Sequence, residues 1–281
     1  MKTLSQRLTI VIAAVFCAAA SAGSAAAPGS PGFPWPGGAR AAVSLAYDDA
    51  LDSQLDHALP DLDRLGLRAS FYLTLASDGV TRRMGDWRAA AARGHELGNH
   101  TLFHQCARSQ PGHEWVSAEN DLDTTSAAGL AAQVRLGNAM LQALDGRRER
   151  TLTVPCGDLL AAGEPWLPKV QGEFVAIKAG AGGVVVDMAA LDLKAVGVIA
   201  PEGVSGAWLI AQAEAAAAAG TMVNFTFHGI DGEYLNVSRA AHRELLEYLA
   251  GHPGKFYVDT FLGIARTVQA VRATQAQLKG S

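Results

Sequence analysis

Short apolar runs alternate with longer amphipathic segments along most of the chain beyond residue 40. The short runs are apolar and contain β-branched or aromatic residues, which favours buried strands. The longer segments repeat apolar residues at helical spacing and end at glycines such as Gly66, Gly94, Gly220 and Gly251, as helices commonly do. The predicted strands cover residues 41–47, 69–75, 152–154, 174–177, 182–186, 222–227 and 256–258, with another short strand ending near residue 100. The predicted helices cover residues 55–65, 87–93, 125–144, 208–219 and 238–250, and a last helix runs to about residue 273.

This alternation predicts a parallel sheet whose strands are joined by right-handed helical crossovers. About seven such units follow one another without a break in composition, which indicates one α/β domain. We expect it to be a distorted (β/α) barrel of about seven parallel strands, closed or nearly closed. A doubly wound open sheet is the alternative. No Gly-x-Gly-x-x-Gly follows the first strand, so a dinucleotide-binding fold has no support.

The N-terminal segment has the charged, apolar and small-residue order of a secretory signal peptide. We predict a signal peptide over residues 1–27, a Pro/Gly-rich arm over 28–38 and a catalytic domain over 39–275, in a protein that is exported to the periplasm or secreted. A membrane anchor is the alternative for the first segment, but its apolar run is shorter than the roughly 20 residues of a spanning helix. No membrane span is predicted after signal removal.

Net charge and cysteine content exclude one class of function and predict one covalent bond. The formal net charge of −4 excludes a strongly basic nucleic-acid binder. The predicted signal peptide contains Cys17, which leaves Cys106 and Cys156 as an even pair in an exported chain. Export favours oxidation, so we predict a Cys106–Cys156 disulfide, with two unpaired buried thiols as the alternative.

Three groups of polar residues lie at the ends of predicted strands, where barrels of this kind collect catalytic residues. Asp48 and Asp49 are adjacent carboxylates that repel each other unless a cation is present. His100 and His104 are spaced i, i+4, so they share one face if their segment is helical, a common geometry for metal ligation. His228 ends a third strand. Together they supply imidazole and carboxylate ligands with coordination positions left for water and substrate.

These groups resemble, in order and context, the motifs of the NodB-homology polysaccharide deacetylases, carbohydrate esterase family 4. Tyr47-Asp48-Asp49-Ala50 is similar to the family's Thr-Phe-Asp-Asp-Gly, residues 100–104 match His-Ser/Thr-x-x-His, and Phe227-His228-Gly229 is similar to a variant of Leu-x-His-Asp. The resemblance implies a NodB-type barrel in which Asp49, His100 and His104 bind one divalent metal. Asp48 would then be the general base and His228 the general acid. Zinc suits these ligands best, and Co²⁺, Ni²⁺ or Fe²⁺ would also fit.

Two other motifs of the family are altered in this chain. Where the family has Arg-x-Pro-Tyr, residues 153–156 read Thr-Val-Pro-Cys. The resemblance implies that the backbone N–H of Cys156 stabilises the oxyanion, because this role does not depend on the side chain. Thr153 replaces the arginine that pairs with the base, so Asp48 is expected to lack its cationic partner. The Asp-x-x-Asp-Trp motif survives at most around Asp187 and Asp192, without the tryptophan.

The sequence therefore predicts an exported metal-dependent hydrolase that removes N-acetyl or O-acetyl groups from an acetylated poly- or oligosaccharide. A catalytically weak carbohydrate-binding protein that retains the fold is the first alternative, because two motifs have lost side chains. A non-haem iron oxygenase is the second, although such sites usually occur on all-β folds. The glycan, the native metal and the oligomeric state do not follow from the sequence.

Overall fold

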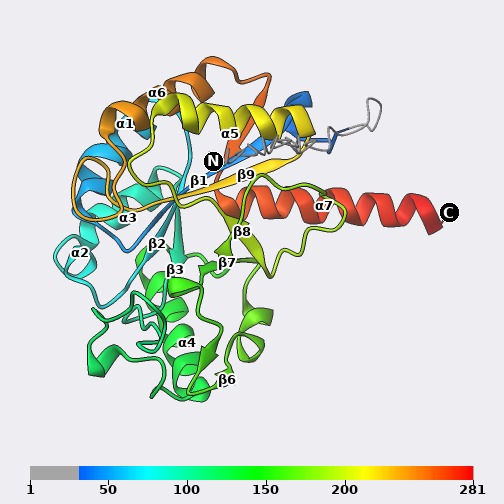
Figure 1. Ribbon diagram of the computed structural model, residues 1–281. Coiled ribbons are helices and arrows are strands. Elements are labelled where there is room, and N and C mark those ends of the chain that lie inside the picture. The colour runs from blue at the N-terminus through cyan, green and yellow to red at the C-terminus, as the bar shows by residue number, and fades with distance from the viewer. Residues whose placement is uncertain (1–31, 281) are drawn as a thin grey trace, which may run out of the picture. The chain divides into compact units, whose positions relative to one another are not determined.

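Seven parallel strands form a nearly closed barrel in the computed structural model, which describes residues 32–280 (Figure 1). Six of them are hydrogen-bonded neighbours in the order β1-β2-β3-β4-β7-β8. The seventh, β9, pairs with β1, and a bridge between Ile199 and Phe225 joins the segment after β8 to β9. The strands are β1 (Ala41–Asp48), β2 (Ser70–Leu73), β3 (Glu96–Asn99), β4 (Thr151–Thr153), β7 (Ala176–Ala181), β8 (Val196–Val198) and β9 (Met222–Phe227). The predicted α/β barrel is thus confirmed.

An additional strand distorts the barrel beside β1. β2 pairs with Ala46–Asp48 at the carboxyl end of β1, whereas β10 (Phe256–Asp259) pairs with Ala41–Ser44 at its amino end. The gap that opens between β1 and β2 at the amino end is therefore filled by β10. A separate two-stranded hairpin consists of β5 (Leu160–Ala161) and β6 (Glu164–Pro165).

Helices join the strands and begin and end at residues suited to that role. Ser126, Ser205 and Ser238 each accept a backbone N–H at a helix start, while Gly66, Gly146 and Gly220 end helices with positive φ. Figure 1 shows α5 and α6 lying together beside β1 and β9. The helices are α1 (Leu59–Leu65), α2 (Asp78–Thr81), α3 (Met84–Ala92), α4 (Ala127–Asp145), α5 (Gly206–Ala219), α6 (Arg239–Gly251) and α7 (Phe261–Gly280). No helix among the described residues is both long and apolar enough to cross a membrane.

The alternation of side chains along β1 divides the interior into two parts. Val43, Leu45 and Tyr47 pack outward into the main apolar cluster with the covering helices. Ala42 and Ala46 point into the barrel, where they belong to a second cluster that contains Phe261 at the start of α7. By the same alternation, Asp48 lies on the inward side of the barrel wall.

Two sequence predictions differ from the structure. Residues 182–186 are not a strand: Val186 is 93% exposed, and β8 is the strand that pairs with β7. A run of valines indicates a pleated, buried surface, but pairing depends on neighbouring strands that the local pattern does not contain. Trp35, in the predicted arm, is buried in the second apolar cluster. The predicted signal peptide lies outside the described residues.

Candidate metal centre

The carboxylate pair lies where β1 ends and the chain turns sharply. Asp48 is the last residue of β1, and Asp49 and Ala50 follow with positive φ values of 80° and 60°. Such φ values are unfavourable for residues other than glycine and are found most often at functional sites. The turn directs the side chains of the two adjacent aspartates to different places.

His100 and His104 lie on a loop, which corrects the helical geometry considered from their spacing. His100 follows β3, and positive φ values at Thr101 (63°) and His104 (49°) fold the loop back on itself. The hydroxyl of Thr101 accepts the backbone N–H of His104 at 3.1 Å, which holds this fold. The two imidazole rings are 4.7 Å apart, so loop folding produces the proximity that a helix would have given.

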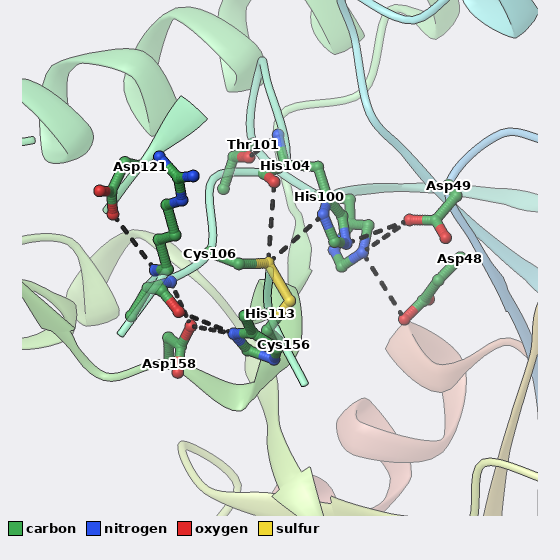
Figure 2. The surroundings of a disulfide bond; sticks show 12 residues. Asp48, Asp49, His100, Thr101, His104, Cys106, His113, Asp121, Cys156 and Asp158 are labelled. Atoms are coloured by element: carbon green, nitrogen blue, oxygen red, sulfur yellow. Dashed lines mark hydrogen bonds and ion pairs between the residues drawn. A yellow bond between two sulfur atoms is a disulfide. The ribbon is translucent and has the colours of Figure 1, made fainter. Parts of the chain in front are cut away.

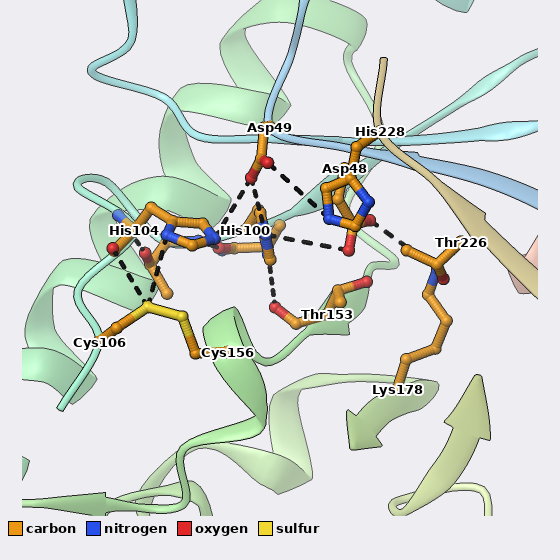
Figure 3. A network of polar contacts seen from close by, with 12 residues as sticks. Asp48, Asp49, His100, His104, Cys106, Thr153, Cys156, Lys178, Thr226 and His228 are labelled. Atoms are coloured by element: carbon orange, nitrogen blue, oxygen red, sulfur yellow. Dashed lines mark hydrogen bonds and ion pairs between the residues drawn. A yellow bond between two sulfur atoms is a disulfide. The ribbon is translucent and has the colours of Figure 1, made fainter. Parts of the chain in front are cut away.

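Asp49, His100 and His104 form one compact group of ligand atoms (Figure 3). Asp49 Oδ1 lies 3.2 Å from His100 Nε2 and 3.3 Å from His104 Nε2. His100 and Asp49 are buried, and His104 is partly buried. The structure thus brings together the three residues that the sequence predicted as metal ligands.

The hydrogen bonding of these three residues is what a bound cation would require. His100 Nδ1 lies 2.8 Å from the carbonyl oxygen of Thr153, so this nitrogen carries the proton and Nε2 presents a lone pair. Asp49 Oδ1 is buried and has no hydrogen-bond partner among the described residues. An acceptor oxygen and imidazole nitrogens that meet without donors are unfavourable unless a positive charge lies between them. The donor set of two imidazoles and one carboxylate suits zinc or a similar divalent metal.

Burial and neighbouring charges shift the pKa values of Asp49, His100 and His104. Burial raises the pKa of Asp49, but the close contact with His100 and the charges of the nearby histidines outweigh it and hold the pKa well below its usual range. Burial and the positive charge of His100 lower the pKa of His104 to about 4. Burial lowers the pKa of His100 as well, but the carboxylates of Asp48 and Asp49 raise it above its usual value. Asp49 is therefore ionised and His104 neutral at neutral pH, which suits ligation, whereas the raised pKa of His100 means that metal binding competes with a proton at this residue.

Asp48 and His228 flank the three ligand atoms without joining them. Asp48 Oδ2 lies 3.9 Å from His100 Nε2, and His228 Nε2 lies 3.9 Å from Asp49 Oδ2. Tyr234, which sequence reasoning missed, donates its hydroxyl to Asp49 Oδ2 at 3.0 Å. No motif marked this tyrosine, because the loop after β9 that carries it is positioned only by tertiary contacts.

Lys178 was also missed, and it corrects the expectation that Asp48 lacks a cationic partner. Its side chain is fully buried inside the barrel, and Nζ lies 4.0 Å from Asp48 Oδ1. The positive charge comes from β7, whereas the family arginine would stand at position 153 on β4. A lysine within an apolar strand gives no signal in the sequence, since its partner is 130 positions away along the chain.

The predicted disulfide between Cys106 and Cys156 is confirmed (Figure 2). It joins the loop that carries His104 to the turn after β4, with 5.9 Å between the two Cα atoms. His104 Nδ1 lies 3.6 Å from Cys106 Sγ, so the bridge directly contacts a residue predicted as a metal ligand. Two further clusters of potential ligands contain these cysteines, but disulfide sulfurs are not thiolate ligands.

The remnant of the fourth motif has no place in the site. Asp187 and Asp192 are exposed, and their carboxylates accept the backbone N–H groups of Ala189 and Lys194. These are local turn contacts of the kind aspartate commonly makes. The surroundings of His228, the predicted general acid, therefore lack both the aspartates and the tryptophan of that motif.

An open cleft of about 490 Å³ leads to the centre. Its lining includes Asp49 and His104 together with the aromatic side chains of Phe103, Trp115 and Tyr234. These three rings are 46%, 63% and 53% exposed, which is unusual for large apolar groups unless they meet a ligand. The cleft thus combines a candidate metal-binding group with aromatic side chains in its walls.

Comparison with known proteins agrees with this fold and site. Residues 37–163 match the family model described as polysaccharide deacetylase, and this segment contains Asp48, Asp49, His100 and His104. The resemblance predicted from the motifs is therefore confirmed over this segment, which is similar to the polysaccharide deacetylases. His228 lies beyond the matched segment. No curated protein matches the sequence significantly.

Solved structures of several deacetylases and of a related pseudoenzyme share the fold. A putative polysaccharide deacetylase from Mycobacterium smegmatis is 14% identical, with a TM-score of 0.58 over 86% of this chain and 95% of that one. The peptidoglycan deacetylase PdaC from Bacillus subtilis is 15% identical, with a TM-score of 0.52 over 85% and 97%. A mutant CE4 family pseudoenzyme with restored enzymatic activity is 16% identical, with a TM-score of 0.50 over 80% and 67%. At these identities the likeness establishes the barrel and not the substrate.

Proposed function

We propose that this protein is an exported, divalent-metal-dependent deacetylase of carbohydrates. The observation that carries the proposal is the convergence of Asp49 Oδ1 with the Nε2 atoms of His100 and His104 at 3.2 and 3.3 Å. A metal ion held by these ligands would polarise the acetyl carbonyl and lower the pKa of a bound water. The disulfide is consistent with export, because such bonds persist in oxidising compartments.

The surrounding residues have positions suited to acid–base catalysis. Asp48 lies beside the ligand group and would accept the proton of the attacking water. His228, across Asp49 from His100, would donate a proton to the departing amine or alkoxide. The backbone N–H of Cys156 would stabilise the oxyanion of the tetrahedral intermediate. The disulfide limits the motion of the turn that carries this N–H.

The cleft favours a sugar substrate. Exposed aromatic rings such as Trp115 and Tyr234 can stack on the apolar face of a sugar ring while their polar edges hydrogen-bond. Arg82 is the one lysine or arginine that lines the cleft in the described part of the chain, so the lining does not select strongly for an anionic polymer. The acetyl group could leave nitrogen or oxygen.

Acetate release from a panel of acetylated glycans tests the proposal. The metal-depleted protein should be inactive, and adding Zn²⁺, Co²⁺, Ni²⁺ or Fe²⁺ singly should restore activity and rank the metals. Full activity in the presence of a strong chelator, with no metal bound, would contradict metal dependence.

A carbohydrate-binding protein with weak catalysis is the second candidate function. It is favoured by Thr153 and Cys156 in the third motif and by the exposed positions of Asp187 and Asp192. In that case the metal-loaded protein would bind an acetylated glycan by calorimetry yet release no acetate from any member of the panel.

A further inference from the structure

A buried lysine lies inside the barrel next to the proposed base. Lys178 belongs to β7, where Ile177 packs outward into an apolar cluster and the alternating position of Lys178 points inward. Its Nζ is 4.0 Å from Asp48 Oδ1 and 3.1 Å from Thr226 Oγ1 (Figure 3). It also lies 3.9 Å from the centre of the Tyr72 ring. Lysine is almost never fully buried unless it is paired, so this position requires an explanation.

The pairing of strands relates Lys178 to the altered third motif. Thr153 of β4 and Lys178 of β7 are register partners in the parallel ladder, so their side chains lie on the same face. The family arginine would occupy position 153, and here the cation stands one strand further around the barrel. Thr153 Oγ1 is buried and has no hydrogen-bond partner in residues 32–280, so this side chain does not take over the role.

The buried carboxylate of Asp48 requires a positive charge close to it. It is 3% exposed, and its Oδ1 has no hydrogen-bond partner among the described residues. A buried carboxylate is costly unless it is paired. In the part of the chain that the structure describes, the two groups within ion-pair distance are His100, whose Nε2 belongs to the ligand group, and Lys178.

We propose that Lys178 is a positioning residue that holds the Asp48 carboxylate by an ion pair across the barrel interior, replacing a cation at position 153. This inference rests on the proposed function, in which Asp48 is the base. The hydrogen bond to Thr226 and the Tyr72 ring fix the ammonium from two other strands.

The charges around Lys178 support this role. Burial lowers its pKa to about 8, while the carboxylates of Asp48 and Glu96 raise it. The ammonium form therefore predominates at neutral pH. The Phe261 ring of α7, 5.7 Å from Nζ, closes the remaining side with apolar surface.

Kinetics of the metal-loaded full chain test the proposal. Lys178→Met should keep stoichiometric metal and KM, because Lys178 does not line the cleft, and should lower kcat by about tenfold or more, a part of the 10²–10⁴-fold contribution of a general base. Adding Thr153→Arg to Lys178→Met should recover part of kcat. The matched control Lys169→Met changes an exposed lysine and should leave kcat unchanged.

A second arm separates positioning from general structure. In an Asp48→Asn background, Lys178→Met should cause no further loss of kcat, because the carboxylate that it positions is gone. An equal loss in both backgrounds, or wild-type kcat in Lys178→Met, would overturn the proposal.

Thermal unfolding tests the Lys178–Asp48 ion pair independently of any enzymatic activity. Lys178→Met and Asp48→Asn should each lower Tm, and the double variant should lose less than the sum of both. If the wild-type protein released no acetate, the proposed function would fail and this cycle would decide the ion pair alone. Additive Tm losses would then overturn the pair as well.

Discussion

Asp48 and Asp49 are adjacent in the chain, yet their carboxylates contact different residues. Asp48 ends a strand and keeps the inward direction of its β position, where Lys178 faces it. Asp49 takes a φ of 80°, which turns its side chain toward His100 and His104. One strained residue thus converts a repelling pair into a candidate base and a candidate ligand.

Replacing His100 by alanine should remove metal and activity together. The substitution removes one of three ligand nitrogens and oxygens, and two remaining ligands hold a divalent ion poorly. Metal analysis of the purified variant and acetate release measure both effects. His252→Ala, which changes an exposed histidine, is the matched control. Full metal content in His100→Ala would contradict the ligand assignment.

Asp48→Asn should have the opposite profile, with metal retained and turnover lost. The amide keeps the shape of the side chain but does not accept a proton, so we expect kcat to fall by about 10²–10⁴-fold. Metal stoichiometry and kcat are measured on the same preparation. Wild-type turnover in this variant would place the base elsewhere.

At the scale of elements, the segments after β3 and β4 supply His100, His104 and Cys156, and none of these residues lies on a strand or an α-helix. The loop of His100 and His104 depends on residues with positive φ, and the turn after β4 contains Cys156 with a φ of 56°. The disulfide joins these two loops, and the carbonyl of Thr153 hydrogen-bonds to His100. The geometry of the centre therefore depends on contacts between loops more than on either loop alone.

Reduction of the disulfide should lower both stability and activity. Closing a loop with a sequence separation of 50 stabilises the fold by up to about 4 kcal/mol in the chain-entropy model. Denaturant unfolding with and without reductant measures this loss. Activity should fall before unfolding begins, because His104 and the Cys156 turn lose their link. A double Cys106→Ala/Cys156→Ala variant should show no response to reductant.

Thiol titration offers an independent check on the bridge. The denatured, unreduced mature chain should show no reactive thiol. Two reactive cysteines per chain would mean that the pair is reduced in the native protein.

The packing of α6 against β1 predicts sensitivity to acid. His242 of α6 is buried and its Nε2 lies 2.6 Å from the hydroxyl of Tyr47. Burial lowers the pKa of His242 to about 3, from 6.5 for an ordinary histidine. Between these values the unfolded chain binds a proton that the folded chain does not, so this group lowers the free energy of unfolding as the pH falls from 6.5 toward 3.

His242→Gln should therefore make the pH dependence of stability shallower in that range. Denaturant unfolding at several pH values measures the slope, and the exposed His252→Gln should leave it unchanged. An identical slope in wild type and His242→Gln would contradict this source of acid sensitivity.

At the scale of the whole molecule, the barrel brings the carboxyl ends of β1, β3 and β9 to one rim. Asp49, His100 and His228 follow these strands and meet there, although they are far apart in sequence. The cleft beside this rim is walled by loop residues such as Trp115 and Tyr234. The strands thus position the proposed chemistry, and the long loops form the surface that a glycan would contact.

Trp115→Ala should weaken glycan recognition without weakening the chemistry. Loss of one aromatic stacking contact of about 0.5–1.5 kcal/mol corresponds to a rise in KM of about two- to tenfold. Turnover of a small acetyl ester should stay at the wild-type value, because that substrate has no sugar ring to stack on Trp115. An unchanged KM for every glycan would exclude Trp115 from the binding surface.

Local patterns predicted most of the elements because their causes are local. Amphipathic periodicity, serine caps and terminal glycines predicted helices such as α5 and α6 close to their observed bounds. The prediction of a strand over the valine-rich residues 182–186 was wrong, because a strand also requires a neighbouring strand to pair with, and the local pattern does not contain one.

The sequence by itself determined the barrel class, the Cys106–Cys156 pair and the five polar residues gathered at the strand ends, because motifs and element order record these directly. Only the tertiary structure decided that the histidine loop is not helical, that Asp187 and Asp192 lie outside the site, and that Lys178 faces Asp48. The physical reason is distance along the chain. A charge pair across a barrel interior depends on strand register and side-chain direction, and neither leaves a pattern in the residues around Lys178.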